Sequence, residues 1–236
     1  MVPIPPLRIA VIINTDEEEP VRLFEEGYIN IFKTLDPGAK VTFYDPVVKQ
    51  EYPNPKDYDL IVVGGGTYIP EDDSTWMKKL REFLKSMVED YASKKMVAIC
   101  LGHQTLATML NGNMSYLPAG PELGITEISL TSKGQDFFGS ETLNLQEFHM
   151  RAIDVAPTGF HPLAEGGQIF LSERNTVFTF QGHPEMSNEL ARFLLSRDSD
   201  YVAGKSEAER ARIVQLGRGK DDGPRVWKRI LEWVRE

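Results

Sequence analysis

The chain has 236 residues, of which 41% are hydrophobic and 26% charged, a composition that allows a substantial buried core. With 26 Lys and Arg against 35 Asp and Glu, the formal net charge is −9, which would repel a nucleic-acid backbone, so we expect no nucleic-acid partner. Cys100 is the single cysteine, and no apolar run approaches a secretion signal or the ~18 residues of a membrane span, so we expect a cytoplasmic protein without membrane contact.

Apolar, β-branched runs alternate with helical periodicity in the first half of the chain, which is typical of a parallel sheet covered by helices on both faces. In chain order, this pattern predicts strands at Leu7–Ile13, Lys40–Tyr44, Leu60–Val63 and Met96–Ile99, and helices from Val21 to Leu35, from Trp76 to Tyr91 and from Thr105 to Leu110. Asp73 or Ser74 is a candidate N-cap for the second helix.

Beyond Leu110 the sequence changes to short β-like segments separated by turn residues, followed by helices. We predict strands at Ile125–Leu130, Leu143–Phe148, Ala152–Val155, Gln168–Leu171 and Val177–Phe180, and helices at Asn188–Arg197, Ser206–Leu216 and Pro224–Val234. No internal repeat and no linker rich in Pro, Gly or Ser divides the chain. The sequence therefore favours one α/β domain over residues 1–236.

Cys100 stands between a predicted buried strand and a predicted helix. Such a turn exposes a side chain at the carboxyl edge of the sheet, next to free N–H groups of a helix start that favour a thiolate. Gly102 suits a turn with no room for a Cβ. A lone cysteine is, however, commonly a buried structural residue, and its position alone supports both interpretations equally.

A second candidate segment, Gly182-His183-Pro184-Glu185, follows the predicted strand at Val177–Phe180. Side chains two apart on extended backbone point the same way, so Glu185 could hold the imidazole of His183. A cysteine, a histidine and a carboxylate are the parts of a thiol acyl-transfer site. Taken alone, the segment is better explained as a turn with a capping glutamate.

Gly64-Gly65-Gly66 follows a third strand and could supply backbone N–H groups to an oxyanion hole, or could simply be a loose turn. The motifs of nucleotide-phosphate loops are absent, so we expect no cofactor. Cys100 and His103 have ligand-like spacing, but no second such pair follows, and we therefore predict no metal site.

In this order and at these separations, the three segments resemble the class I, or triad, glutamine amidotransferases, over Leu7 to about Glu189. The match to the standalone branch, meaning fungal amidotransferase-like proteins and plant gamma-glutamyl peptidases, is carried by Gln181 to Glu185 and by the tail from Asp222 to Val234. The resemblance implies an α/β three-layer sandwich with a central, mostly parallel sheet, the flavodoxin-like fold of this family.

The resemblance also implies roles for individual residues. Cys100 would attack the substrate, His183 would move the proton and Glu185 would orient His183. Gln104 would contact the glutamyl group, and the amides of Leu101 and of a glycine such as Gly65 or Gly66 would hold the oxyanion. The residues alone do not separate His183 from His103 as the base, whereas the family pattern selects His183.

The implied reaction is hydrolysis of a γ-glutamyl amide bond through a thioester, glutamine giving glutamate and ammonia. A separate synthase would then receive the ammonia. The alternatives are a gamma-glutamyl peptidase acting on glutathione-like conjugates, and a non-catalytic regulatory protein that keeps the fold.

One segment departs from the family pattern. Relatives often have an acidic residue within two positions of a histidine where this chain has Phe148-His149-Met150-Arg151-Ala152. If that position binds the substrate's amino group, the preferred substrate would be another γ-glutamyl compound. A plain strand with exposed His149 and Arg151 is the favoured interpretation.

Overall fold

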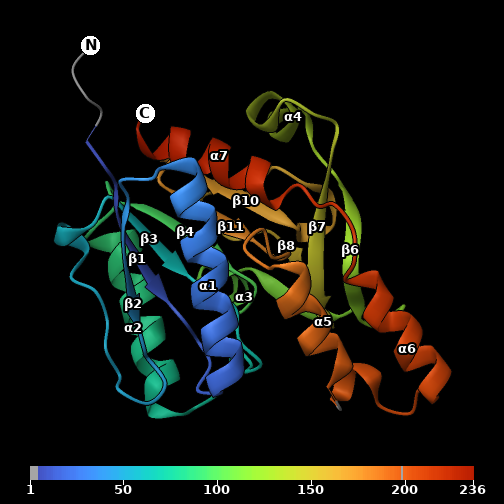
Figure 1. Cartoon of the computed structure of the whole chain (residues 1–236). Coiled ribbons are helices and arrows are strands. Elements are labelled where there is room, and N and C mark those ends of the chain that lie inside the picture. The colour runs from blue at the N-terminus through green and yellow to red at the C-terminus, as the bar shows by residue number, and fades with distance from the viewer. Residues whose placement is uncertain (1–4, 198) are drawn as a thin grey trace.

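The computed structural model describes residues 5–197 and 199–236, and its centre is a seven-stranded sheet (Figure 1). In spatial order the strands are β2 (Lys40–Tyr44), β1 (Arg8–Ile12), β3 (Leu60–Val63), β4 (Lys95–Ile99), β11 (Val177–Phe180), β10 (Ile169–Ser172) and β9 (Phe160–Pro162). Neighbours from β2 to β11 pair in parallel, and β10 pairs antiparallel with both β11 and β9.

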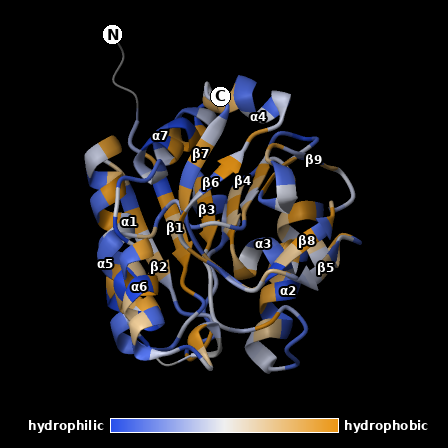
Figure 2. Ribbon diagram, turned by 90° about the vertical axis from the view of Figure 1, so that its right-hand side faces the viewer, coloured by the Kyte–Doolittle hydropathy of each residue, from blue (hydrophilic) through white to orange (hydrophobic). Residues whose placement is uncertain are grey.

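The parallel strands β1, β3, β4 and β11 are largely apolar because both faces of the sheet are covered there. Along β1, Ile9 and Val11 enter one hydrophobic core, whereas Ala10 and Ile12 enter the other. This alternation follows from the period of two in strand side chains. Figure 2 shows the strands mainly in the hydrophobic colour and the flanking helices with hydrophilic residues on their outer sides.

Helices form a layer on each face of the sheet. The first core contains α1 (Glu18–Leu35), α5 (Asn188–Ser196) and α7 (Gly223–Val234), and the second contains α2 (Thr75–Glu89) and α3 (Leu101–Met109). On the first face, the Trp227 ring of α7 packs edge-on against Tyr28 and Phe32 of α1, with centroids 5.9 and 5.2 Å apart. The expected three-layer α/β fold is therefore confirmed.

Two antiparallel pairs lie outside the large sheet. They join β6 (Glu122–Ser129) to β7 (Thr142–His149) and β5 (Asn113–Tyr116) to β8 (Arg151–Val155). The remaining elements are α4 (Ser132–Phe138), α6 (Glu207–Leu216) and 3₁₀ turns at Pro55–Asp57, Glu165–Gly167 and Asp200–Val202. No helix in the described part of the chain is both long and apolar enough to cross a membrane.

The differences from the predicted elements are few. The elements β5, β9 and α4 were not predicted. Helix α3 begins at Leu101 rather than at Thr105, because Cys100 already occupies the N-cap position. Ser74 is the N-cap of α2, although its side chain makes no capping hydrogen bond.

Candidate active site

Cys100 lies in a sharp turn between β4 and α3. Its backbone has φ 48° and ψ −103°, a left-handed φ that is uncommon and strained for a residue with a Cβ. The turn is held by hydrogen bonds from Cys100 N to Phe180 O, 2.7 Å, and from Gln104 N to Cys100 O, 2.9 Å. This geometry places the thiol at the carboxyl edge of the parallel strands, where 8% of the residue remains exposed.

The turn requires a close approach between α3 and β3. A Cβ on Gly102 would lie 2.8 Å from the Val63 carbonyl oxygen, too close for an unstrained contact. The expectation that Gly102 leaves no room for a side chain is thus confirmed. Because Leu101 is the first residue of α3, its N–H group has no hydrogen-bond partner within the helix.

His183 and Glu185 follow β11, the strand next to β4. His183 N donates to Gln146 O of β7, 2.8 Å, which anchors the loop. His183 Nδ1 and Glu185 Oε1 are 2.8 Å apart, and both side chains are buried. The predicted contact between the imidazole and the carboxylate is therefore present, with Pro184 between them.

The surroundings of His183 favour its charged form. Burial opposes the imidazolium, but the neighbouring Glu185 carboxylate and Cys100 outweigh it and raise the pKa of His183 well above its usual value of 6.5. The ring and the thiol line the same pocket, so the imidazolium lies near the sulfur. An imidazolium beside a thiol stabilises the nucleophilic thiolate.

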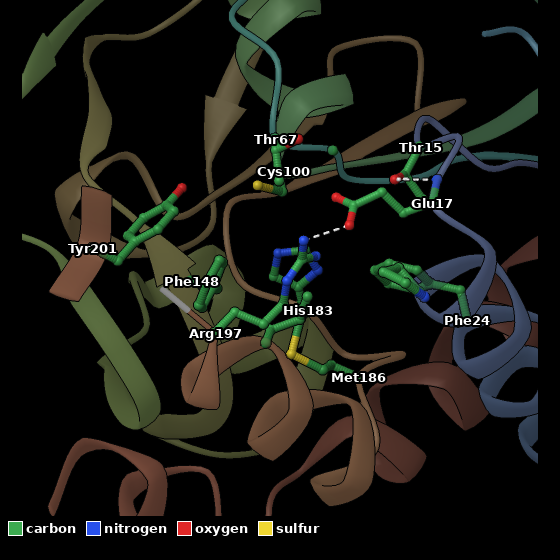
Figure 3. A pocket seen from close by; sticks show the side chains of 13 residues that line it. Thr15, Glu17, Phe24, Thr67, Cys100, Phe148, His183, Met186, Arg197 and Tyr201 are labelled. Carbon is green, nitrogen blue, oxygen red and sulfur yellow. Dashed lines mark hydrogen bonds and ion pairs between the residues drawn. The ribbon is translucent and has the colours of Figure 1, made fainter. Parts of the chain in front are cut away.

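The glycine loop after β3 completes the arrangement around the thiol (Figure 3). A Cβ on Gly65 would lie 2.7 Å from His183 Cε1 and 3.2 Å from Cys100 Cβ. A Cβ on Gly66 would lie 2.4 Å from the Asn14 carbonyl oxygen and 3.1 Å from a methyl group of Leu101. The structure thus brings together six of the seven predicted site residues, namely Cys100, His183, Glu185, Gly65, Gly66 and Leu101.

Gln104, the seventh, is tied to protein groups. Its Nε2 donates to Gln181 Oε1, 2.9 Å, and to Arg151 O, 3.2 Å, and 4% of the residue is exposed. Gln104 therefore links α3 to β8 and to the loop that carries His183. Contact with a substrate remains a prediction for this residue.

His103, the alternative base, is buried on the other side of α3. Its Nδ1 lies 2.8 Å from Thr179 Oγ1, and its ring stacks on Phe170 at a centroid distance of 5.5 Å. Burial lowers the pKa of His103 to about 3, so the ring is neutral near pH 7. These contacts are those of a core histidine.

The favoured interpretation of His149 as an exposed strand residue is wrong, because 2% of it is exposed. Its Nδ1 donates to Arg151 O, 2.9 Å, and its Nε2 lies 3.0 Å from one oxygen of Glu147 and from one of Glu122. Acidic groups are thus present at this histidine. Glu147 could have been found from the sequence, since residues two apart on a strand share a face, whereas Glu122 depends on the pairing of β6 with β7.

The contacts of His149 favour its charged form. A carbonyl oxygen only accepts, so Nδ1 donates, and Nε2 faces two carboxylates. Despite burial, Glu122 and Glu147 raise the pKa of His149 to about 10. Ligand atoms of these three residues lie within 4.8 Å of one another, so among the described residues they form the group that could hold a metal ion. An imidazolium at His149 is the alternative to a metal ion, because its positive charge also balances the two carboxylates.

Cys100 and His183 open into one pocket (Figure 3). Apolar and aromatic side chains dominate its walls, including Phe24, Phe148, Met186, Leu194 and Tyr201. The Phe148 and Tyr201 rings are 4.3 Å apart between centroids. An ion pair between Glu17 and Arg197 also lines the pocket. Sequence reasoning missed most of these residues because they come from segments far apart in the chain.

Comparisons with known proteins identify the family of the chain. The family model "Glutamine amidotransferase class-I" matches residues 28–198. The chain is 33% identical to the glutamine amidotransferase-like protein chyE of Penicillium rubens over 236 residues, 98% of each chain. It is 28% identical to gamma-glutamyl peptidase 4 of Arabidopsis thaliana over 72% of each chain. The crystal structure of a glutamine amidotransferase from Thermotoga maritima superposes with a TM-score of 0.78, at 16% identity, over 98% of this chain and 99% of that one. The chain therefore belongs to the class I glutamine amidotransferase family.

Proposed function

We propose that this protein hydrolyses a γ-glutamyl amide bond through a thioester on Cys100. The observation that carries the proposal is the placement of the thiol beside His183, which in turn contacts the buried carboxylate of Glu185. A scaffold has no physical need for a strained cysteine beside a charged imidazole in one pocket, with an orienting carboxylate buried behind the imidazole.

In the first half of the reaction, Cys100 Sγ adds to the γ-carbonyl carbon. The oxyanion accepts hydrogen bonds from the N–H groups of Leu101 and of Gly65 or Gly66, each contributing roughly 3 kcal/mol in comparable acyl-transfer sites. His183 gives its proton to the amide nitrogen, the carbon–nitrogen bond breaks, and ammonia or an amine leaves. The product is a γ-glutamyl thioester.

In the second half, His183 accepts a proton from water while the water oxygen attacks the thioester. The carbon–sulfur bond breaks, glutamate leaves, and Cys100 is again a thiolate beside an imidazolium. Glu185 holds the ring of His183 in one orientation through both halves, with its carboxylate on Nδ1. With glutamine as substrate the product is ammonia, which a separate synthase would use.

A gamma-glutamyl peptidase is the second candidate. The largely apolar walls of the pocket suit an amine larger than ammonia, and one relative is named a gamma-glutamyl peptidase. The two candidates share every step above and differ only in the leaving amine.

The decisive assay measures glutamate released from glutamine and, separately, from a γ-glutamyl dipeptide. Release from either supports the hydrolase, and release from the dipeptide alone decides for the peptidase. Cys100→Ala should abolish turnover and leave the melting temperature within a few degrees. A variant that still turns over substrate, or one that no longer folds, would contradict a nucleophilic role for Cys100.

Alkylation separates the hydrolase from a non-catalytic protein of the same fold. Because Cys100 is the single cysteine, one adduct in a mass spectrum reports its reactivity without ambiguity. A thiolate held by His183 should react with iodoacetamide within minutes near neutral pH, more slowly in His183→Gln. Inert wild-type protein would speak for a structural thiol.

A further inference from the structure

The pocket at Cys100 contains one pair of opposite charges that the mechanism above does not use. Glu17 and Arg197 form an ion pair and both line the pocket. Among the described residues of this lining they alone carry a permanent charge, and their neighbours are apolar or uncharged polar groups and the Cys100–His183 pair. Figure 3 shows Arg197 reaching across the pocket to the Glu17 carboxylate, next to His183.

We propose that Glu17 and Arg197 recognise the two charged groups of a γ-glutamyl substrate, Glu17 binding the α-ammonium and Arg197 the α-carboxylate. The inference rests on the proposed function and defines its substrate class as γ-glutamyl compounds with a free amino-acid head. Three carbon–carbon bonds, about 4 Å when extended, join the γ-carbonyl carbon to the α-carbon, so one pocket can hold both the reacting carbonyl and the head.

The positions of the two residues suit this role. Glu17 is the N-cap of α1 and Arg197 is the C-cap of α5, so each side chain projects from a helix end. Their side chains are 39% and 38% exposed, and an ion pair with that exposure is weak, so a ligand can replace each partner at little cost. The apolar walls strengthen the new charge-assisted contacts by excluding water.

The other acidic side chains near the thiol do not meet this requirement. The carboxylates of Glu147 and Glu185 are fully buried, and each contacts a histidine ring. Neither lines the pocket. An incoming ammonium could reach them only by displacing His149 or His183, whereas Glu17 is accessible where it stands.

The test combines two variants with three substrates. The substrates are the γ-glutamyl amide that wild type hydrolyses best, its analogue without the α-amino group and its analogue without the α-carboxylate. In wild type, each deletion should raise KM roughly tenfold or more, as expected for loss of a charge-assisted contact. Glu17→Gln should raise KM for the parent by a similar factor and leave the des-amino analogue unaffected. Arg197→Gln should likewise raise KM for the parent and leave KM for the analogue without the α-carboxylate unaffected.

Matched controls are Glu18→Gln and Arg192→Gln, which remove the same charges from exposed neighbours and should leave KM unchanged. If the ion pair serves only to hold α1 against α5, both variants will lose the same factor on all three substrates, and the inference is overturned. Equal KM values of wild type for the three substrates overturn it as well.

Failure of the proposed function gives a different pattern. In that case wild type hydrolyses none of the substrates and Cys100 resists alkylation, and the present inference falls with it. A reactive Cys100 and measurable turnover, together with no effect of the two charge variants, would leave the hydrolase standing and refute the assignment of Glu17 and Arg197 alone.

Discussion

The charge of His183 depends on Glu185, which lies 2.8 Å from Nδ1 and is completely buried. The backbone at Glu185 packs closely on α1, because a Cβ added to Gly27 would approach the Glu185 carbonyl oxygen to 3.1 Å. Tyr28, on the next position of α1, has its pKa raised by burial and by the charge of Glu185. The carboxylate is therefore buried between α1 and the imidazole, where its charge acts on both His183 and Tyr28.

Replacing this carboxylate by an amide should lower both the rate and the pKa of His183. Because the imidazolium form would then be lost at lower pH, we expect the alkaline limb of the kcat/KM profile of Glu185→Gln to move to lower pH. The loss in kcat should be roughly 10²–10⁴-fold, as for other orienting carboxylates. A pH profile identical to wild type, with Glu189→Gln as the exposed control, would show that Glu185 does not set the charge of His183.

At the level of single residues, sequence reasoning succeeded where partners are close in the chain. The contact of Glu185 with His183 was predicted from their separation of two residues; it is present, although Pro184 and Glu185 form a turn closed by a hydrogen bond from Met186 N to His183 O, 3.2 Å, and are not extended. The surroundings of His149 were predicted wrongly, because one of its acidic partners, Glu122, is brought to it by the register of β6 against β7. No local pattern encodes that register.

Among the elements, the turn from β4 into α3 is tightly constrained and carries the thiol. The Cys100 backbone is strained, and the helix start lies against the Val63 carbonyl at Gly102. The contact is between the backbone of α3 at Gly102 and the backbone of β3 at Val63. A side chain at position 102 can therefore be accommodated only if α3 shifts as a unit.

Gly102→Ala should therefore destabilise the protein by about 1–3 kcal/mol and also reduce turnover, because a shift of α3 displaces the N–H group of Leu101 and the thiol together. Urea denaturation and kcat measurement on one preparation test both effects. An alanine variant with wild-type stability and rate would show that the approach of α3 to β3 relaxes without cost.

The strands predicted with correct bounds, β2, β3 and β11, are apolar or β-branched runs with clear turn residues at their ends. Other elements lack such signals. The edge strand β9 has three residues, one of them Pro162, and α4 contains Gly134 and is only seven residues long. These elements are formed by contacts with neighbours, as in the pairing of β9 with β10, and not by local preference.

At the scale of the whole molecule, α7 closes one face of the sheet and ties the two ends of the described chain together. Asp36, at the end of α1, accepts hydrogen bonds from Leu7 N, 3.3 Å, and from the Arg235 guanidinium, 2.6 Å. The strand β1, next to the edge strand β2, and the helix α7 both lie outside the segment that the family model matches, residues 28–198. That segment thus lacks parts of the core on which the site rests.

Trp227 tests this dependence on α7. Its side chain is fully buried and contacts Tyr28 and Phe32. The charge of Glu185 contributes to the raised pKa of Tyr28, so Tyr28 lies between Trp227 and the site. Trp227→Ala should cost about 3–5 kcal/mol of unfolding free energy through the cavity it leaves. For a protein of this size, that cost corresponds to a fall of roughly 6–20 °C in Tm.

Thermal unfolding followed by circular dichroism measures this loss, with Glu232→Ala as a control on the exposed side of the same helix. The control should melt within a degree or two of wild type, because surface changes away from packed groups have little effect. If Trp227→Ala had the same Tm as the control, α7 would contribute little to stability, and the residues before it would form a stable core without it. A large loss in the tryptophan variant alone would show that the tail is part of the core that supports Glu185.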